Sequence, residues 1–334
     1  MTQPQLAEPA APPASGWELV RPGLGAVERQ LEREGMGHAE ALAAIANELR
    51  QAGGKRLRPA LLLLAAGACG APDSEQAVRL GAIIEMLHAA TLVHDDILDG
   101  AGLRRGQPSA PARWGAQNAV LAGDWLYMRA FERALAERDL EILELLISLT
   151  RGMVEGELLQ LELVGRLVAP EQHRELIERK TARLFAVAAQ LGAMAARASI
   201  AWQLALASFG HHLGMAFQMV DDLLDFTARP EVLGKPAGLD IFSGKMTLAA
   251  IYAHAESNEA ERGYWRDLLR PASEKPHNLT EVRALLERRQ GLARARAEAA
   301  AEAEKAAEQL RLLPDSAYRR ALERLPAWVL ARQA

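Results

Sequence analysis

The sequence of 334 residues has a single cysteine, Cys69, and a net charge of only −4. One cysteine excludes an internal disulfide and is typical of a reducing compartment. The residue itself is most simply read as a small buried apolar side chain. The weak negative charge argues against a nucleic-acid partner, because proteins that bind nucleic acids usually carry a basic surface. The composition is otherwise that of an ordinary globular chain, 50% hydrophobic and 25% charged.

The sequence also lacks signals for membranes and export. No uncharged apolar run reaches the roughly 18 residues that a membrane span needs. The segment from Met1 to Ser15 is rich in Ala and Pro, without the basic start and apolar core of a secretory signal. We expect residues 1–20 to be a disordered lead-in. We also expect a cytoplasmic protein with at most peripheral membrane contact, where a hydrophobic product would leave it.

Alternating Val/Ile/Thr-rich runs are nearly absent, whereas Ala, Leu, Glu and Arg dominate. Asp73 and Gln76 resemble a capping box that begins a long buried helix ending near Leu98. The segment 291–310, rich in Ala, Glu and Arg, is typical of an exposed peripheral helix. Solenoid-type repeats are absent. Helices are predicted over residues 38–51, 59–69, 73–98, 116–136, 140–164, 170–190 and 200–226, and again from 246. The predicted fold is all-α, a single large helical bundle of residues 21–334 around a deep central cavity.

Two segments share a pattern of two adjacent aspartates followed by a third. They read Asp95-Asp96-Ile97-Leu98-Asp99 and Asp221-Asp222-Leu223-Leu224-Asp225. Each ends a long apolar run, so each is predicted to lie on a helix. Residues four apart share a helix face, so Asp95 lies beside Asp99, and Asp221 beside Asp225. The sequence therefore predicts two pairs of neighbouring carboxylates.

A solvated acidic face is the ordinary explanation for one such cluster. Two identical clusters among Leu, Val, Ile, Met and Phe are different, because an unpaired charge there is costly. Mg²⁺ takes one or two protein carboxylates and completes its shell with water and phosphate oxygens. The first aspartates are 126 residues apart (221 − 95) and must converge to form one site. We therefore predict two facing half-sites with metal and phosphate between them.

Basic residues flank both acidic motifs. Lys55, Arg56 and Arg58 precede a predicted helix, whose N-terminus itself favours an anion. Arginine forks suit phosphate oxygens, and two arginines follow the first motif. Each cation alone is an ordinary surface charge, but together they indicate a diphosphate cage. Its predicted members are Lys55, Arg58, Arg104, Arg105, Lys180, Lys235 and Lys245.

One histidine is aligned with the first motif. His88 lies seven residues before Asp95, so it returns to within about 20° of the same helix face. His88, Thr91, Asp95 and Asp99 thus form one stripe. A lone histidine on a helix is usually a core residue, but this alignment favours a ligand contact.

Two uncharged polar residues accompany the second motif. Gln218 lies three residues before Asp221, on the acidic face, and Thr181 follows Lys180. Both can point oxygen dipoles at a developing cation. Helix packing or capping explains them equally well.

With these residues in place, the chain resembles the trans-type polyprenyl diphosphate synthase family from about Ala41 to Leu330. One departure is Ala249, where the family commonly has Pro after a Thr-Leu pair; it concerns a helix start and not the chemistry. The resemblance rests on both aspartate motifs, Gly54-Lys55-Arg56-x-Arg58-Pro59, Arg104-Arg105-Gly106-x-Pro108, Gly123-Asp124, Glu155-Gly156-Glu157-x-x-Gln160, Phe217-Gln218, and the Gly234-Lys235…Asp240…Gly244-Lys245-x-Thr247-Leu248 run.

The resemblance implies a Mg²⁺-dependent condensation of isopentenyl diphosphate with an allylic diphosphate, in which about three metal ions draw the diphosphate off the allylic carbon. The isopentenyl double bond attacks the resulting carbocation, and a proton is then lost to the departing diphosphate. It also implies a homodimer. The implied metal-site residues are Asp95, Asp99, Asp221, Asp222 and Asp225. Arg104, Lys180, Lys235 and Lys245 would grip the allylic diphosphate, and Lys55, Arg58, His88 and Arg105 the isopentenyl diphosphate.

The residues below the first aspartate bear on product length. Short-chain members of the family carry a bulky aromatic floor five and four residues before it, where this chain has Ala90 and Thr91. The first motif also has no insertion between its aspartates. The pattern resembles a long-chain synthase, of the octaprenyl or heptaprenyl type, whose product would serve a quinone side chain. The bottom of the pocket for the growing chain would then lie deeper, at Leu146 or Met153, and would set a product length between C30 and C50.

Four alternatives remain open at this stage. One is a shorter-chain synthase that makes geranylgeranyl or farnesyl diphosphate. Another is a subunit, catalytic or noncatalytic, of a heteromeric synthase, although a noncatalytic one usually loses an aspartate motif. A class I terpene cyclase shares the first motif but needs a different second motif. A di-iron bundle needs paired Glu-x-x-His motifs, of which Glu85 to His88 is a single example.

Overall fold

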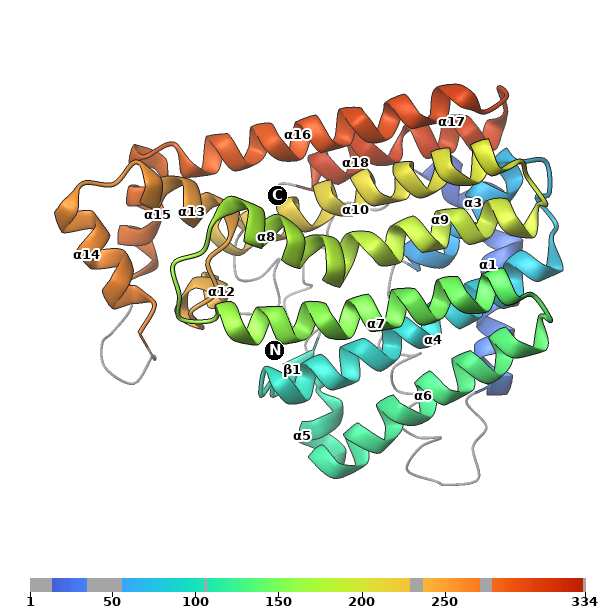
Figure 1. The fold of residues 1–334 in the computed structure, drawn as a ribbon, viewed down its shortest axis with the longest axis horizontal. Coiled ribbons are helices and arrows are strands. Elements are labelled where there is room, and N and C mark those ends of the chain that lie inside the picture. Colours follow the sequence, from blue (N-terminus) through green and yellow to red (C-terminus); the bar gives the residue numbers. More distant parts are fainter. Residues whose placement is uncertain (1–13, 35–55, 105–106, 229–236, 271–277, 333–334) are drawn as a thin grey trace, which may run out of the picture.

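A computed structural model describes residues 14–34, 56–104, 107–228, 237–270 and 278–332 (Figure 1). Most of these residues are helical, which confirms the all-α prediction. A two-residue hairpin, β1 (Leu103–Arg104) with β2 (Gln107–Pro108), follows the first motif. The helices are α1 (Ala14–Glu34), α3 (Leu57–Ala68), α4 (Glu75–Leu98), α5 (Ala110–Trp114), α6 (Ala116–Ala136), α7 (Leu140–Leu163), α8 (Pro170–Ile177), α9 (Arg183–Ala195), α10 (Ile200–Thr227), α12 (Leu239–Phe242), α13 (Leu248–Ala255), α14 (Glu259–Leu268), α15 (Leu279–Arg288), α16 (Gly291–Gln309), α17 (Ala317–Glu323) and α18 (Leu325–Ala331).

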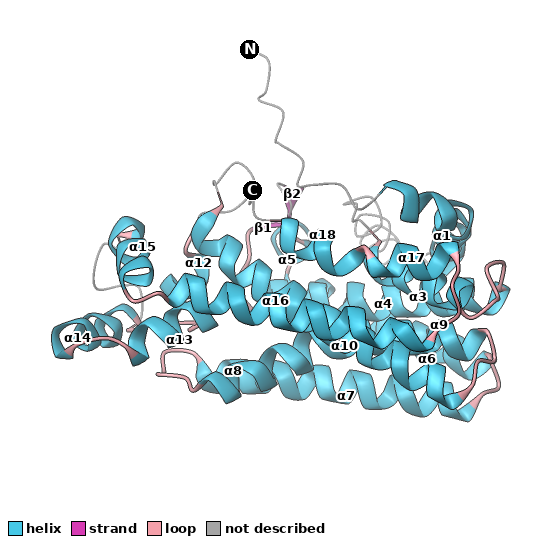
Figure 2. Ribbon diagram, turned by 90° about the horizontal axis from the view of Figure 1, so that it is seen from above, coloured by secondary structure: helices cyan, strands magenta, loops and turns pink. Residues whose placement is uncertain are grey.

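The two helices that carry the acidic motifs lie at the centre of the bundle. Helix α10 packs against α9 and α16, and α4 packs against α6, α3, α1 and α9. The long helices run roughly side by side across the view, with α16 along one edge and α6 along the other (Figure 1); Figure 2 shows the same bundle from above. Both motifs fall at the C-terminal ends of their helices, so their aspartates are positioned by helical turns rather than by loops.

Helix α4 is the one described helix long and apolar enough, by length and composition, to cross a membrane. Within its most apolar window 61% of the residues are buried by the rest of the protein, as in the central helix of a bundle. Its N-cap is Ser74, whose hydroxyl accepts a hydrogen bond from the Ala77 amide. The predicted cap at Asp73 is therefore wrong by one residue, because the serine hydroxyl reaches the amide three residues on.

Two other expectations are corrected. Residues 14–20 belong to α1, and Val20 is buried in the core, so the disorder predicted for residues 1–20 is wrong for residues 14–20. Residues 1–13 and the predicted helix 38–51 lie outside the described residues.

Helix α16 is not simply exposed: Ala295, Ala299 and Ala303 form a buried stripe on this helix, which packs against α10. The small alanine side chains let the two helices approach closely. The single domain of residues 21–334 stays a prediction.

The predicted helix 170–190 contains a π-helical turn, Glu178–Ala182, between α8 and α9. Glycines on the neighbouring helices leave room for this turn. A side chain at Gly214 of α10 would place its Cβ 2.6 Å from Ala182 Cα, and one at Gly156 of α7 would lie 2.9 Å from Arg179 Cβ. π-Turns interrupt α-helices most often at functional sites. This one carries two predicted site residues, Lys180 and Thr181.

Gly214→Ala should therefore lower the free energy of unfolding by about 1–3 kcal/mol, because its Cβ meets backbone that cannot rotate away. Gly263→Ala in α14 is the control, since nothing lies within 4 Å of its Cβ. An alanine there should stabilise the helix by about 0.5–1 kcal/mol. Chemical denaturation of both variants gives the comparison, and equal stabilities would contradict the close packing on the π-turn.

Candidate functional site

An ion pair joins the two halves of the site. Lys245, which follows α12 and the second motif, donates from Nζ to Asp99 Oδ1 over 2.9 Å. Asp99 is the C-cap of α4, at the end of the first motif. Residues 146 positions apart in sequence thus meet, as the prediction of facing half-sites requires. The ammonium group supplies a counter-charge beside the first motif.

Asp95 has an unusual electrostatic environment. Its Oδ1 atom is buried and has no hydrogen-bond partner among the described residues. Burial is the main cause that raises its pKa to about 7, and the nearby carboxylates of Glu157 and Asp99 raise it further. The cations Lys180 and Arg104 act in the opposite direction. The ionised form of Asp95 is therefore disfavoured in the protein alone, and a bound cation would stabilise it.

Lys180 is held at the site by α7. Its Nζ donates to Glu157 Oε2 and to Gln160 Oε1, both over 2.8 Å. The π-helical turn carries Lys180 to this position next to Asp95, whose charge it influences. The sequence flagged the segment with Glu157 and Gln160 only as part of the resemblance. The structure shows that these two side chains orient the lysine.

Asp221 is the most accessible aspartate of the second motif. It pairs with Arg332, just past the end of α18, whose Nη2 lies 2.8 Å from Asp221 Oδ1. The guanidinium also stacks over Phe217, 4.2 Å from the ring centroid, and over Trp328 at 5.7 Å. Sequence analysis missed Arg332 because nothing local marks an arginine near the C-terminus as a partner for an aspartate 111 residues earlier (332 − 221).

The other two aspartates of this motif are turned into the protein. Asp222 accepts hydrogen bonds from His173 Nε2 at 3.0 Å and from Gln218 Nε2 at 2.9 Å. Asp225 is 1% exposed and accepts a hydrogen bond from the Asp240 amide at 3.0 Å. Both carboxylates thus fix neighbouring segments. Sequence analysis missed His173, because a single histidine within an amphipathic helix gives no sign of a contact with a distant aspartate.

The middle aspartate of the first motif behaves in the same way. Asp96 is 2% exposed, and Arg104 binds it with both arms of its fork, with Nε 2.7 Å from Oδ2 and Nη2 2.6 Å from Oδ1. This bidentate pair anchors the β1–β2 hairpin, which carries Arg104, to α4. Arg105 lies outside the described residues.

Arg58 and His88, to which the resemblance gives a shared role, lie next to each other. Arg58 Nη1 lies 3.0 Å from His88 Nε2, and the guanidinium stacks over Phe185 at 4.9 Å from the centroid. Arg56 instead binds the carboxylates of Glu28 and Glu85. Glu85 and His88 thus contact two different arginines, Arg56 and Arg58. Lys55 and Lys235 lie outside the described residues.

The two residues below Asp95 differ in their surroundings. Thr91 is half-buried on the Asp95 side of α4, and its hydroxyl donates to the His88 carbonyl over 2.7 Å. Ala90 is fully buried in the main hydrophobic core. One helical step of about 100° separates the two side chains. Thr91 therefore borders the space beneath the acidic motif more directly than Ala90.

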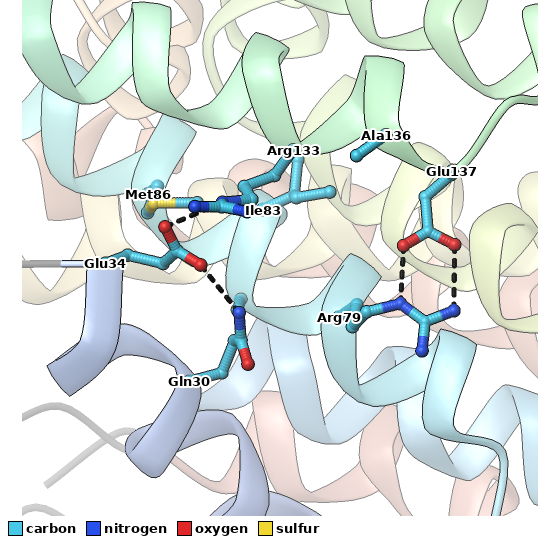
Figure 3. A pocket seen from close by; sticks show the side chains of 9 residues that line it. Gln30, Glu34, Arg79, Ile83, Met86, Arg133, Ala136 and Glu137 are labelled. Carbon is cyan, nitrogen blue, oxygen red and sulfur yellow. Dashed lines mark hydrogen bonds and ion pairs between the residues drawn. The ribbon is translucent and has the colours of Figure 1, made fainter.

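A cavity of about 260 Å³ lies between α1, α4 and α6 (Figure 3). Its lining mixes apolar and charged side chains: Glu34 accepts from Gln30 and Arg133, and Arg79 pairs with Glu137. A hydrocarbon chain would meet unfavourable polar groups there. Met86 is the lining residue nearest to Asp95 in sequence, about 13 Å lower along α4. This cavity is therefore separate from the acidic site.

The site residues fit a divalent metal ion. No group of three or more His, Cys, Asp or Glu side chains in the described part of the chain forms a complete metal cage. Instead, Asp95, Asp99 and Asp221 offer a few carboxylates from two helices. Mg²⁺ binds in this way, with phosphate oxygens and water as its remaining ligands.

Comparison with known proteins agrees with this geometry. Residues 39–286 match the Polyprenyl synthetase family. The chain belongs to this family. An all-trans-nonaprenyl-diphosphate synthase (geranyl-diphosphate specific) of Rhodobacter capsulatus is 40% identical over 310 residues, which is 91% of this chain and 93% of that protein. The chain is thus a polyprenyl diphosphate synthase, a trans-prenyltransferase.

Solved structures of polyprenyl synthases share the whole architecture. A decaprenyl diphosphate synthase from Rhodobacter capsulatus superposes with a TM-score of 0.91 at 33% identity, over 96% of this chain and 98% of that one. A polyprenyl synthase from Caulobacter crescentus CB15, complexed with calcium and isoprenyl diphosphate, gives the same TM-score and coverage at 36% identity. The family binds divalent metal together with diphosphate substrates.

The raised pKa of Asp95 gives a test of stability against pH. A carboxyl that binds its proton more tightly when folded makes the protein less stable as the pH rises from about 4 to about 7. Without metal, Asp95→Asn should therefore have a higher Tm than the wild type at pH 8, and this difference should shrink steadily as the pH is lowered to about 4. Adding Mg²⁺ with inorganic pyrophosphate should raise the Tm of the wild type more than that of the variant. A lower Tm for Asp95→Asn at pH 8 would contradict this account.

Proposed function

We propose that this protein is a long-chain trans-polyprenyl diphosphate synthase. It would join isopentenyl diphosphate to an allylic diphosphate, such as farnesyl or geranylgeranyl diphosphate, by repeated 1′-4 condensation. The observation that carries the proposal is the buried, unpartnered Oδ1 of Asp95 in a cluster of carboxylates and cations, opposite Lys245 from the second half. The named relatives, which include nona- and decaprenyl synthases, support a long-chain product, which we place in the C30–C50 range. Such a product would serve a quinone side chain.

Asp95, Asp99 and Asp221 are the side chains that would hold Mg²⁺, about three ions with substrate bound. Asp222 and Asp225 would support that site from behind, because their oxygens accept hydrogen bonds from the protein. Bound Mg²⁺ supplies charge neutralisation for the diphosphate that leaves the allylic carbon. We also propose a cytoplasmic location for the protein, because a chain with a single cysteine is typical of a reducing compartment.

The chain's own groups position the two substrates. Lys180, Arg104 and Lys245, with Lys235, would bind the allylic diphosphate. Arg58 and His88, with Lys55 and Arg105, would bind isopentenyl diphosphate so that its double bond faces the allylic carbon. Thr181 and Gln218 would direct oxygen dipoles at the positive charge that develops there. Catalysis then comes from orientation and fixed charge, which supply most of the rate in such reactions.

A second copy of the chain is the proposed partner. Exposed apolar side chains recur every seven residues along α6, at Leu121, Met128 and Leu135, and along α7. On α7 they are Leu140, Ile147, Val154 and Leu161. The two helices pack against each other along one flank of the bundle (Figure 1). A seven-residue apolar repeat on an exposed helix is typical of helix–helix association, which supports a homodimer through this face.

The defining experiment is incubation with isopentenyl and farnesyl diphosphates plus Mg²⁺, followed by chromatography of the products. A product of C30–C50 is expected, with none after removal of divalent ions by a chelator. If this protein, incubated with Mg²⁺ and without any other subunit, leaves farnesyl diphosphate unchanged, a homomeric synthase would be refuted.

The two diphosphate sites should separate kinetically. Arg58→Ala or His88→Ala should raise the KM for isopentenyl diphosphate about 10- to 150-fold, since a hydrogen bond to a charged group is worth about 1.5–3 kcal/mol. Lys245→Ala should instead raise the KM for the allylic substrate. Steady-state kinetics with each substrate varied in turn gives both values. A shift of the same KM in all three variants would contradict the division.

Thr91 should influence product length. Each isoprene unit lengthens the tail by about 5 Å, close to one helical turn, so a ring one turn below Asp95 should stop growth early. Thr91→Phe is expected to give products of about C15–C20 with little change in Tm. Ala90→Phe should overpack the core and cost about 1–3 kcal/mol. If Ala90→Phe shortens the product at unchanged Tm, Ala90 borders the tunnel as the sequence suggested.

The dimer face gives a further test. Met128→Glu places a charge in the proposed interface and should shift the protein towards monomer in light scattering. Leu312→Glu is a matched control, because Leu312 is 63% exposed and Met128 is 64% exposed. The control should keep the mass of the wild type. A monomeric wild type, or equal masses for all three proteins, would exclude this interface.

A further inference from the structure

A chain of hydrogen bonds runs from α8 to the π-helical turn. His173 of α8 lies with Nε2 3.0 Å from Asp222 Oδ2, and Asp222 Oδ1 lies 2.9 Å from Gln218 Nε2. Gln218 Oε1 then lies 2.8 Å from Thr181 Oγ1. His173, Asp222 and Thr181 are each less than 9% exposed, so little water competes for these bonds. The chain joins a histidine outside the predicted site to three residues inside it, Asp222, Gln218 and Thr181.

The carboxylate determines the direction of every bond in this chain. An ionised Asp222 can only accept, so His173 Nε2 and the Gln218 amide nitrogen must both donate to it. The amide of Gln218 is thereby oriented with its oxygen towards Thr181. Thr181 must then donate its only hydroxyl proton to Gln218. The hydroxyl oxygen of Thr181 keeps lone pairs but has no proton left to offer, so it can act only as an acceptor or as the negative end of a dipole.

We propose that His173 is a positioning residue for the condensation. Its N–H holds the Asp222 carboxylate, and through Gln218 it fixes the Thr181 hydroxyl as a dipole whose negative end is available to the allylic carbon. The inference rests on the proposed roles of Thr181 and Gln218. Without the histidine donor, Asp222 loses one of its two hydrogen bonds, and Gln218 and Thr181 are no longer held in one arrangement. The stabilisation of positive charge then falls, while diphosphate binding does not depend on this chain.

A second histidine in the same region provides the control. His212 of α10 is also paired with a carboxylate, with Nδ1 2.6 Å from Glu302 Oε2 on α16. Glu302 bonds onward to Lys305, on its own helix, and no bond in this group reaches Thr181 or Gln218. Loss of His212 thus removes a comparable histidine–carboxylate contact without touching the chain from His173 to Thr181.

The test measures binding of a charged probe rather than turnover. An ammonium analogue of the farnesyl cation is titrated by calorimetry with Mg²⁺ and inorganic pyrophosphate, and its uncharged carbon isostere is titrated in parallel. The ratio of the two dissociation constants reports how well the site stabilises positive charge. His173→Leu should reduce this preference for the cation by about 2- to 10-fold, the range of one neutral hydrogen bond. His173→Gln, whose amide nitrogen can replace Nε2 as donor, should restore it to within about twofold.

The remaining variants make the outcome decisive. His212→Leu should lower the Tm but leave the preference for the cation unchanged. His173→Met is a second donor-free variant in case leucine does not fold. Gln218→Met should lose at least as much of the preference as His173→Leu, because it also removes the Gln218 dipole, and adding His173→Leu to it should cause no further loss, because both break one chain. An unchanged preference in the folded donor-free variants, or no rescue by glutamine, would overturn the positioning role. A wild type that makes no polyprenyl product would instead overturn the proposed function.

Discussion

The constraint on which the structure depends is the concentration of carboxylates at one end of a helical bundle. Ion pairs or hydrogen bonds offset the mutual repulsion of most aspartates in the two motifs. Asp99 and Asp221 are paired with cations from distant segments, and Asp96 with the arginine of the adjacent hairpin. Asp95 alone remains largely uncompensated, and its raised pKa records the cost. Under the proposed function, binding of a divalent ion and a diphosphate beside Asp95 would offset that cost.

The two motifs are alike in sequence and also in how their members divide the work. In each, the first aspartate faces the site, whereas the second points into the protein and organises a neighbour. Asp96 holds Arg104 on the hairpin, and Asp222 holds Gln218 and His173. An adjacent pair on a helix must diverge by about 100°, so two neighbouring carboxylates cannot both face one ligand. In each pair the second aspartate is therefore a structural support, and the first is left as the candidate ligand under the proposed function.

Much of the fold was readable from the sequence, because long amphipathic helices have a clear period. The predicted ends of α6 match the structure, and those of α7 and α10 differ by one residue. The pairing of Arg58 with His88 and the approach of Lys245 to the first motif also agree with the expected site. Arg332 and His173 were not predictable, because their importance comes only from tertiary packing. The buried alanine stripe of α16 was misread since alanine is equally common on exposed helices.

The π-helical turn has a consequence for how this site is built. Such a turn amounts to one residue inserted into a continuous helix, and each residue of α-helix advances the rotation by about 100°. The insertion therefore sets the angular phase between α8, which carries His173, and α9, which packs against α3 and α10. In a regular helix of one residue fewer, one of these two faces would turn away from its partners. The local irregularity thus allows a single stretch of chain to pack into the hydrophobic core with one half and to present Lys180 and Thr181 to the proposed site with the other.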